Sequence, residues 1–143
     1  MRLALQTDYA LRTLIFLAVR AERSTVVQVS QFYGISPAHV AKVVNLLSRY
    51  GYIRSVRGAG GGIELARPSD EISVGEVIRQ FEGNMHLLEC VGTENVCVIQ
   101  PFCKLKSVLG EAERIQQEYL NRITIADILP TRKQVYQLAT NIV

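Results

Sequence analysis

The sequence predicts a mainly α-helical protein with a small β-hairpin wing, organised as a winged helix-turn-helix followed by a long dimerisation helix. Three observations predict this fold class. Apolar residues recur at helical spacing on both sides of a tight turn at Gly34, a glycine-rich link joins two short β-like runs, and a second apolar stripe follows three clustered cysteines. The chain has 143 residues, 48% of them hydrophobic and 20% charged, which suits one globular unit with an extension.

The helix-turn-helix is expected from three successive helical segments. The first follows Thr7, which is placed to be its N-cap, and the second covers Val26–Tyr33. Gly34 then supplies the turn, because glycine adopts positive φ without steric cost. Ser36 followed by a proline is an N-cap with proline at the first helical position. The third helix, which begins there, is expected to run to about Tyr50 with its valines facing inward.

The wing is expected from two β-like runs, Tyr52–Arg57 and Ile63–Ala66. Four glycines among residues 58–62 allow the backbone between the runs to turn sharply and to approach a partner closely. A phosphate-binding glycine loop is the rival interpretation. Such loops join a strand to a helix and usually carry a lysine, whereas this one joins two strands and has none. The pattern therefore favours a wing.

Charge is unevenly distributed along the chain. Residues 1–80 carry ten basic and six acidic side chains, and no acidic residue lies between Glu22 and Glu64. A segment of one sign suits a polyanion such as double-stranded DNA, because each neutralised phosphate releases counterions. A solvated surface would give the same composition.

The DNA contacts are expected from the third helix and the wing. Early, exposed residues of a recognition helix reach base edges in the major groove, and a glycine tip beside arginines suits the adjacent minor groove or its phosphates. The predicted DNA-binding residues are Ser36, Ala38, His39, Lys42, Arg54, Arg57, Gly60 and Gly61. For His39, an ordinary surface histidine is the alternative.

The chain beyond the wing is expected to hold a short helix over Ile72–Glu82, then a loop and a long helix. We assign residues 1–82 to the DNA-binding domain, 83–104 to a loop that carries all three cysteines, and 105–143 to the dimerisation helix with a C-terminal segment. The apolar stripe that begins at Leu105 could pack on its own domain or on a second copy. DNA readers of this kind usually act as symmetric dimers, which favours a homodimer. The apolar tail Val135–Val143 is expected to dock on the folded part.

Three cysteines, Cys90, Cys97 and Cys103, lie in the loop. In a reducing cytosol, clustered thiols more often indicate a metal or a redox role than a disulfide. A structural zinc site usually has closely spaced cysteine pairs and four ligands, whereas these spacings are wider and only three thiols are present. Iron–sulfur clusters tolerate wide spacing, so the pattern favours a cluster with an incomplete fourth position. Three buried cysteines acting as small apolar side chains are the alternative.

The chain resembles the Rrf2 family of winged-helix iron–sulfur regulators over nearly its whole length. The marks of the resemblance are Met1-Arg2-Leu3 with Thr7-Asp8-Tyr9-Ala10-Leu11-Arg12, the wing Val56-Arg57-Gly58-Ala59-Gly60-Gly61-Gly62, and Cys103-Lys104-Leu105 at the end of the cysteine loop. Members are dimeric repressors, some of which also activate, controlled by the state of their cluster. The resemblance implies the same for this chain.

Within the family, the sequence looks more like the nitric-oxide-sensing members than like the other branches. Those members hold a 4Fe-4S cluster whose fourth ligand is an aspartate from the other subunit; Asp8 stands at that position, and Arg12 matches the basic residue beside it. The cluster-biogenesis members, which hold a 2Fe-2S cluster, have a histidine where this chain has Lys106. Iron-responsive members share the three cysteines without requiring the aspartate.

The resemblance therefore implies a ligand set that spans two subunits. The implied metal ligands are Cys90, Cys97 and Cys103 of one subunit and Asp8 of the partner subunit, with Arg12 supporting the switch. From the residues alone, Asp8 is simply an acid near a helix N-terminus, where the helix dipole favours it. His86 and Glu89 stay open as alternative fourth ligands.

Other functional classes are disfavoured. A small iron–sulfur electron-transfer protein has no use for a recognition helix and a basic wing, and an enzyme needs paired acid–base or nucleophilic groups that this chain lacks. No apolar run approaches the roughly 18 residues of a membrane helix, and no signal peptide is recognisable, so a cytoplasmic protein without a membrane partner is expected. The expected partners are a near-palindromic DNA operator, a second copy of the chain, and nitric oxide as the signal.

Overall fold

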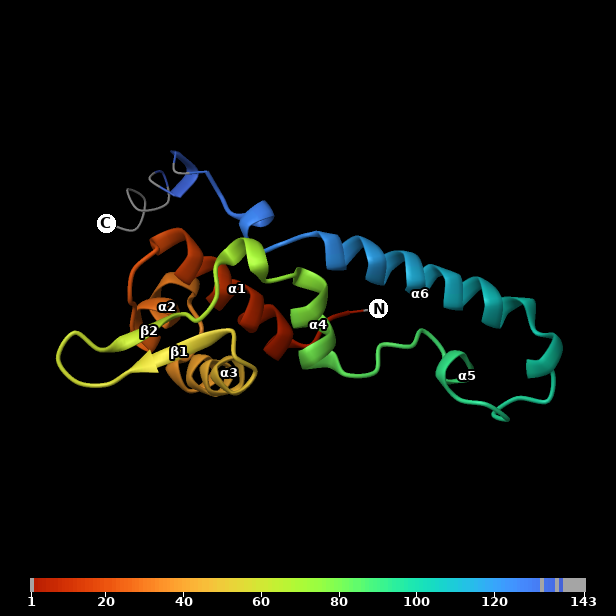
Figure 1. The fold of residues 1–143 in the computed structure, drawn as a ribbon. Coiled ribbons are helices and arrows are strands. Elements are labelled where there is room, and N and C mark those ends of the chain that lie inside the picture. Colours follow the sequence, from red (N-terminus) through yellow and green to blue (C-terminus); the bar gives the residue numbers. More distant parts are fainter. Residues whose placement is uncertain (1, 132, 136, 138–143) are drawn as a thin grey trace.

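Three helices and a two-stranded hairpin make up the N-terminal part of the computed structural model (Figure 1). The structure describes residues 2–131, 133–135 and 137. In chain order the elements are α1 (Leu5–Arg20), α2 (Val26–Tyr33), α3 (Pro37–Arg49), β1 (Ile53–Val56) and β2 (Gly62–Leu65). This is the order of a winged helix-turn-helix, so the predicted fold class is confirmed.

Local signals set the bounds of α2 and α3. Thr25 caps α2 in a reciprocal capping box, and Gly34 ends the helix with φ at 65°, in the left-handed region. The hydroxyl of Ser36 accepts a hydrogen bond from the backbone N–H of His39 at 3.3 Å, which confirms Ser36 as the N-cap of α3. One side of α3 is buried in the core, and its buried residues are Val40, Val43, Val44 and Leu47.

The start of α1 differs from the prediction. The helix begins at Leu5 with Ala4 as N-cap, and no side chain caps it. Thr7 lies inside the helix and is fully buried, and its hydroxyl donates a hydrogen bond to Glu82. The same carboxylate oxygen of Glu82 accepts from the backbone N–H of Ala4 at 2.8 Å. The prediction of Thr7 as the N-cap was wrong because a distant carboxylate satisfies both this hydroxyl and the helix terminus.

The hairpin forms the wing. β1 and β2 pair antiparallel, with Arg54 opposite Glu64. At the tip, a Cβ on Gly61 would lie 2.4 Å from the carbonyl oxygen of Val56, so only glycine fits this turn. Ser24 forms an isolated antiparallel bridge with β2, which ties the segment between α1 and α2 to the wing.

The C-terminal half consists of shorter elements and one long helix. The helices are α4 (Val74–Glu82), α5 (Glu89–Gly92) and α6 (Lys104–Arg122), and single 3-10 turns lie at Ser69–Glu71, Gln100–Phe102 and Ala126–Ile128. α4 packs against α1, and α6 projects from the body as an arm with α5 beside its far end (Figure 1).

The near end of α6 is joined to the body by backbone hydrogen bonds. The N–H of Val74 donates to the carbonyl of Ile123 at 2.8 Å, and the N–H of Ile125 donates to the carbonyl of Ile72 at 2.9 Å. The backbone of α6 passes within 2.7 Å of where a Cβ on Gly75 would lie, and Ile125 is fully buried. These contacts fix the direction of the arm relative to the winged helix-turn-helix.

The long helix itself buries no residue, although it carries the predicted apolar stripe. Four large apolar side chains on it are 55% to 63% exposed: Leu105, Val108, Ile115 and Tyr119. The predicted helix is confirmed, and its apolar face is not covered by the part of the chain that the structure describes. The predicted docking segment Val135–Val143 lies largely outside the described residues. Within the described residues, no helix combines the length and the apolar character needed to cross a membrane.

Candidate DNA-binding surface and cysteine loop

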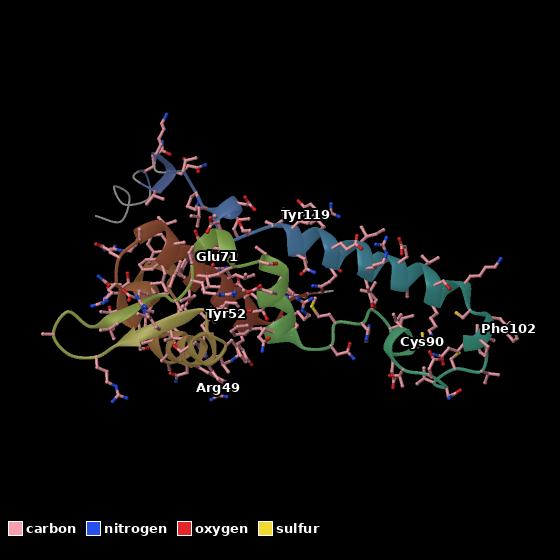
Figure 2. All side chains as sticks on the ribbon, viewed as in Figure 1. Arg49, Tyr52, Glu71, Cys90, Phe102 and Tyr119 are labelled. Atoms are coloured by element: carbon pink, nitrogen blue, oxygen red, sulfur yellow. The ribbon has the colours of Figure 1, made fainter. Side chains whose placement is uncertain are left out.

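The exposed side of α3 carries the residues predicted to contact bases. Ser36, Ala38, His39 and Lys42 are all exposed, whereas the valines of the same helix are buried. This separation follows from the helical period, which turns successive apolar positions to one side. Arg49, labelled on α3 in Figure 2, is a further exposed cation on this helix that the sequence-based set left out.

The wing holds its two predicted arginines in different ways. Arg54 Nε donates to Glu64 Oε1 at 2.6 Å, and Arg23 Nε donates to the other carboxylate oxygen at 2.9 Å. These hydrogen bonds, from Arg54 first and then from Arg23, hold the pKa of Glu64 below its ordinary value. Arg57 is exposed and takes part in none of the ion pairs between described residues, so its charge is not offset within the wing.

Arg23 belongs to the wing surface, although sequence reasoning did not place it there. Its guanidinium donates to the carbonyl oxygen of Gly60 at 3.4 Å as well as to Glu64. Gly60 is exposed at the wing tip and Gly61 is half-buried beneath it. Because 37 residues separate Arg23 from Gly60, no local pattern in the sequence reveals the contact.

Replacing Glu64 with glutamine is expected to strengthen non-specific DNA binding. The carboxylate offsets the charges of Arg54 and Arg23, and its removal leaves both guanidinium groups available to phosphates. We expect the affinity for a random duplex at low salt to rise about two- to tenfold, with a steeper dependence on salt concentration. Fluorescence anisotropy at several salt concentrations measures both quantities. Glu71→Gln removes an exposed acid outside the wing, and an equal rise in that variant would show that only net charge matters.

A polar pair on α1 lies over the helix-turn-helix. Asp8 Oδ1 accepts a hydrogen bond from Arg12 Nε at 2.9 Å, and both side chains are partly exposed. The Arg12 guanidinium lies 5.7 Å from the ring centre of Tyr33 in α2. Burial raises the pKa of Tyr33, and Arg12 partly offsets that rise. The neighbouring Tyr9 ring lies 6.1 Å from the ring of His39 in α3, so this part of α1 contacts both helices.

The three cysteines share one loop but do not converge on one point. Cys90 lies in α5, Cys97 is exposed in the irregular segment, and Cys103 is the N-cap residue of α6; all three thiols are free. Among the described residues, no three His, Cys, Asp or Glu side chains come close enough to hold a single metal ion. Figure 2 places Cys90 near the far end of α6, whereas Asp8 lies in α1 within the body. One protomer therefore does not bring Asp8 to its own cysteines.

The donor set fits an iron–sulfur cluster. Thiolates are the ligands that such clusters take, and they surround a group of atoms rather than one ion. Cys103 stands at the N-terminus of the 19-residue α6, and no side chain caps that helix. For the fourth position, His86 Nδ1 lies 2.9 Å from Glu113 Oε2 and is engaged there, while Glu89 is exposed beside Cys90.

The comparisons with known proteins agree with this geometry. Residues 3–131 match the Rrf2 family, described as an iron-dependent transcriptional regulator. The HTH-type transcriptional regulator NsrR of Bacillus subtilis is 39% identical over 141 residues, covering 96% of this chain and 97% of that protein. Among solved structures, CymR (YrzC), the global cysteine regulator of B. subtilis, aligns with a TM-score of 0.75 at 22% identity over 90% of this chain and 95% of that one. IscR of T. potens aligns with a TM-score of 0.72 at 26% identity, covering 90% and 85%.

Proposed function

Because the chain belongs to the Rrf2 family of iron-dependent transcriptional regulators, we propose that it is a dimeric repressor whose iron–sulfur cluster senses nitric oxide. Family membership makes it a DNA-binding transcription regulator and not an enzyme. Two observations support the dimeric, cluster-controlled form. Within a protomer, α1 with Asp8 lies apart from the cysteine loop (Figure 1), and the described residues leave the apolar face of α6 uncovered. A second copy would bring an aspartate to the loop and cover this face.

The uncovered face of α6 suits a second copy of itself. Burial of apolar surface is a main favourable term in protein association, and the four exposed apolar side chains lie on one side of the helix. Two α6 helices packed antiparallel about a twofold axis would place the cysteine end of each beside the body of the other. This arrangement would deliver Asp8 of the partner subunit to the cysteine loop.

We assign Cys90, Cys97 and Cys103 of one protomer, together with Asp8 of the partner subunit, as the cluster ligands. When bound, a 4Fe-4S cluster would supply one iron held by an oxygen instead of a thiolate, the place where nitric oxide would bind. Asp8 also has a cationic partner within the protomer, because Arg12 Nε donates a hydrogen bond to its carboxylate at 2.9 Å. The carboxylate therefore has two alternative partners, and exchange between them is the basis of the switch.

Release of Asp8 would alter the contacts of α1. Arg12 lies over Tyr33 of α2, and Tyr9 contacts His39 of α3, so a shift at this end of α1 reaches both helices of the helix-turn-helix. The tethered dimer would hold its two α3 helices at the spacing of successive major grooves on a near-palindromic operator, and the released dimer would not. The tether thus biases a two-state element, and loss of the tether lowers operator affinity.

The test of this function is an anaerobic titration of the purified, cluster-loaded protein with nitric oxide. Absorbance reports the cluster, and anisotropy of a labelled operator reports DNA binding in the same sample. We expect a 4Fe-4S spectrum that collapses in proportion to added nitric oxide, with operator release in step. A 2Fe-2S spectrum, or a cluster inert to nitric oxide but lost on iron chelation, would assign the protein to redox or iron sensing instead.

Asp8→Ala is expected to weaken the tether between subunits. The cysteines can still hold a cluster, but its lifetime should fall and the nitric oxide concentration for half-release of the operator should change about tenfold, which corresponds to roughly 1.4 kcal/mol. The anaerobic nitric oxide titration measures the concentration for half-release, and the cluster absorbance in the same sample measures the lifetime. Asp70→Ala removes an exposed acid elsewhere on the body and serves as the control. If cluster uptake and nitric oxide response are unchanged in Asp8→Ala, the cross-subunit tether is wrong.

A further inference from the structure

Gln100 is a buried glutamine in the middle of the cysteine loop. Its exposed fraction is 6%, although most residues around it in the loop are exposed. Val98 is 98% exposed and Phe102 is 89% exposed, so the loop is not held by an apolar core of its own. The loop therefore buries the side-chain amide of Gln100.

The side chain of Gln100 satisfies three backbone groups at once. Its Nε2 donates to the carbonyl oxygen of Cys90 at 3.0 Å and to that of Thr93 at 2.6 Å. Its Oε1 accepts from the backbone N–H of Val96 at 3.0 Å. A buried amide is costly unless its donors and acceptor are paired, and here both kinds are.

These hydrogen bonds join the segments that carry the three thiols. One bond reaches Cys90 itself, a second reaches the residue before Cys97, and Gln100 stands three positions before Cys103. The backbone N–H of Gln100 also donates to the carbonyl of Cys97 at 3.1 Å. One residue is thus bonded to the backbone at or next to two of the cysteines and lies on the turn that leads to the third.

We propose that Gln100 is a positioning residue that organises the cysteine loop before any cluster is present. The inference rests on the proposed function, because it concerns the ligand loop assigned there. Ordering the loop backbone in advance removes part of the entropic cost of gathering three thiols around a cofactor. Gln100 contacts the backbone and not the thiols, so it acts through the cysteines rather than as a ligand.

The test compares Gln100→Leu with the wild type, first in the metal-free protein and then in the protein reconstituted with a cluster. Leucine has a similar size but cannot replace any of the three hydrogen bonds. In the metal-free protein, hydrogen exchange at the Val96 amide should accelerate about tenfold, and alkylation of the half-buried Cys90 should accelerate severalfold, which are the effects expected when one net hydrogen bond is lost. After reconstitution, the cluster should be lost to a chelator about tenfold faster than in the wild type.

Two further variants make the result specific. Gln100→Glu keeps an acceptor for the Val96 amide but loses both donors, so Val96 should stay protected while alkylation of Cys90 accelerates. Gln80→Leu removes an exposed amide from α4 and should change none of these values. A metal-free Gln100→Leu protein with unchanged exchange and alkylation, or a reconstituted one with unchanged cluster lifetime, would overturn the positioning role. A wild type that takes up no cluster would overturn the proposed function, while the exchange data still report on the hydrogen bonds.

Discussion

Ile115→Glu is expected to convert the protein to a monomer and to lower its operator affinity by about 100-fold or more. The side chain is 55% exposed near the middle of the uncovered apolar face of α6. A carboxylate there would have to be buried without a partner in a dimer, which is strongly unfavourable. A monomer engages one half-site at a time, and specific affinities of dimeric regulators depend on both half-sites.

One preparation is enough to test this prediction: sedimentation equilibrium measures the oligomeric state, and the anisotropy of a labelled operator measures the affinity. Because Ile115 is exposed within a protomer, the variant should keep its helical circular dichroism, while its thermal midpoint should fall to that of a monomer. Ser107→Glu adds the same charge to the same helix, about 100° around the axis from Val108, and should remain dimeric in the metal-free protein. A dimeric Ile115→Glu protein with full operator affinity would show that α6 is not the interface, and the delivery of Asp8 to the partner would lose its structural basis.

The helix-turn-helix and wing could be predicted because their signals are local. Ser36 and the proline after it are enough to predict where α3 begins. Gly34 predicts the turn by itself, because glycine readily adopts the positive φ found there. Such features depend on near neighbours in the chain and need no knowledge of the tertiary structure. The pairing of Arg54 with Glu64 was not predicted, because it depends on the hairpin register, which the structure shows.

Contacts between distant segments could not be predicted in this way. Thr7 is of a residue type that often caps helices and stands where an N-cap is expected. Its hydroxyl nevertheless donates to Glu82, which lies 75 positions away in the chain. Arg23 reaches the wing across 37 positions to Gly60 and 41 to Glu64, and nothing in its own segment indicates the contact. Gln100 is harder still, because a glutamine in a polar loop is expected to face water, and only the folded loop buries it.

The ligand role of Asp8 is a different case. The spacing of the cysteines favours a cluster without identifying its fourth ligand, and α1 alone explains Asp8 as an acid in a first helical turn. The structure adds that α1, which carries Asp8, lies apart from the cysteine loop within a protomer (Figure 1) and that Arg12 donates a hydrogen bond to the Asp8 carboxylate. Both facts are consistent with a ligand that comes from the partner subunit, and the assignment itself remains a proposal.

Cys97→Ala should abolish the cluster and, with it, the high-affinity operator complex. Cys97 is exposed and contributes nothing to the core, so the winged helix-turn-helix should fold and melt as in the metal-free wild type. We expect no cluster absorbance after anaerobic reconstitution and a loss of operator affinity of about tenfold or more, while affinity for a random duplex stays within about twofold because the basic surface is unchanged. Iron and sulfide analysis with paired anisotropy titrations measures these values, and Ser107→Ala is the control in the same region.

The comparison of operator affinity with random-duplex affinity separates specific operator binding from non-specific DNA binding. Loss of specific binding alone places the switch in the cysteine loop, whereas full operator binding by cluster-free Cys97→Ala would leave the loop without a part in regulation.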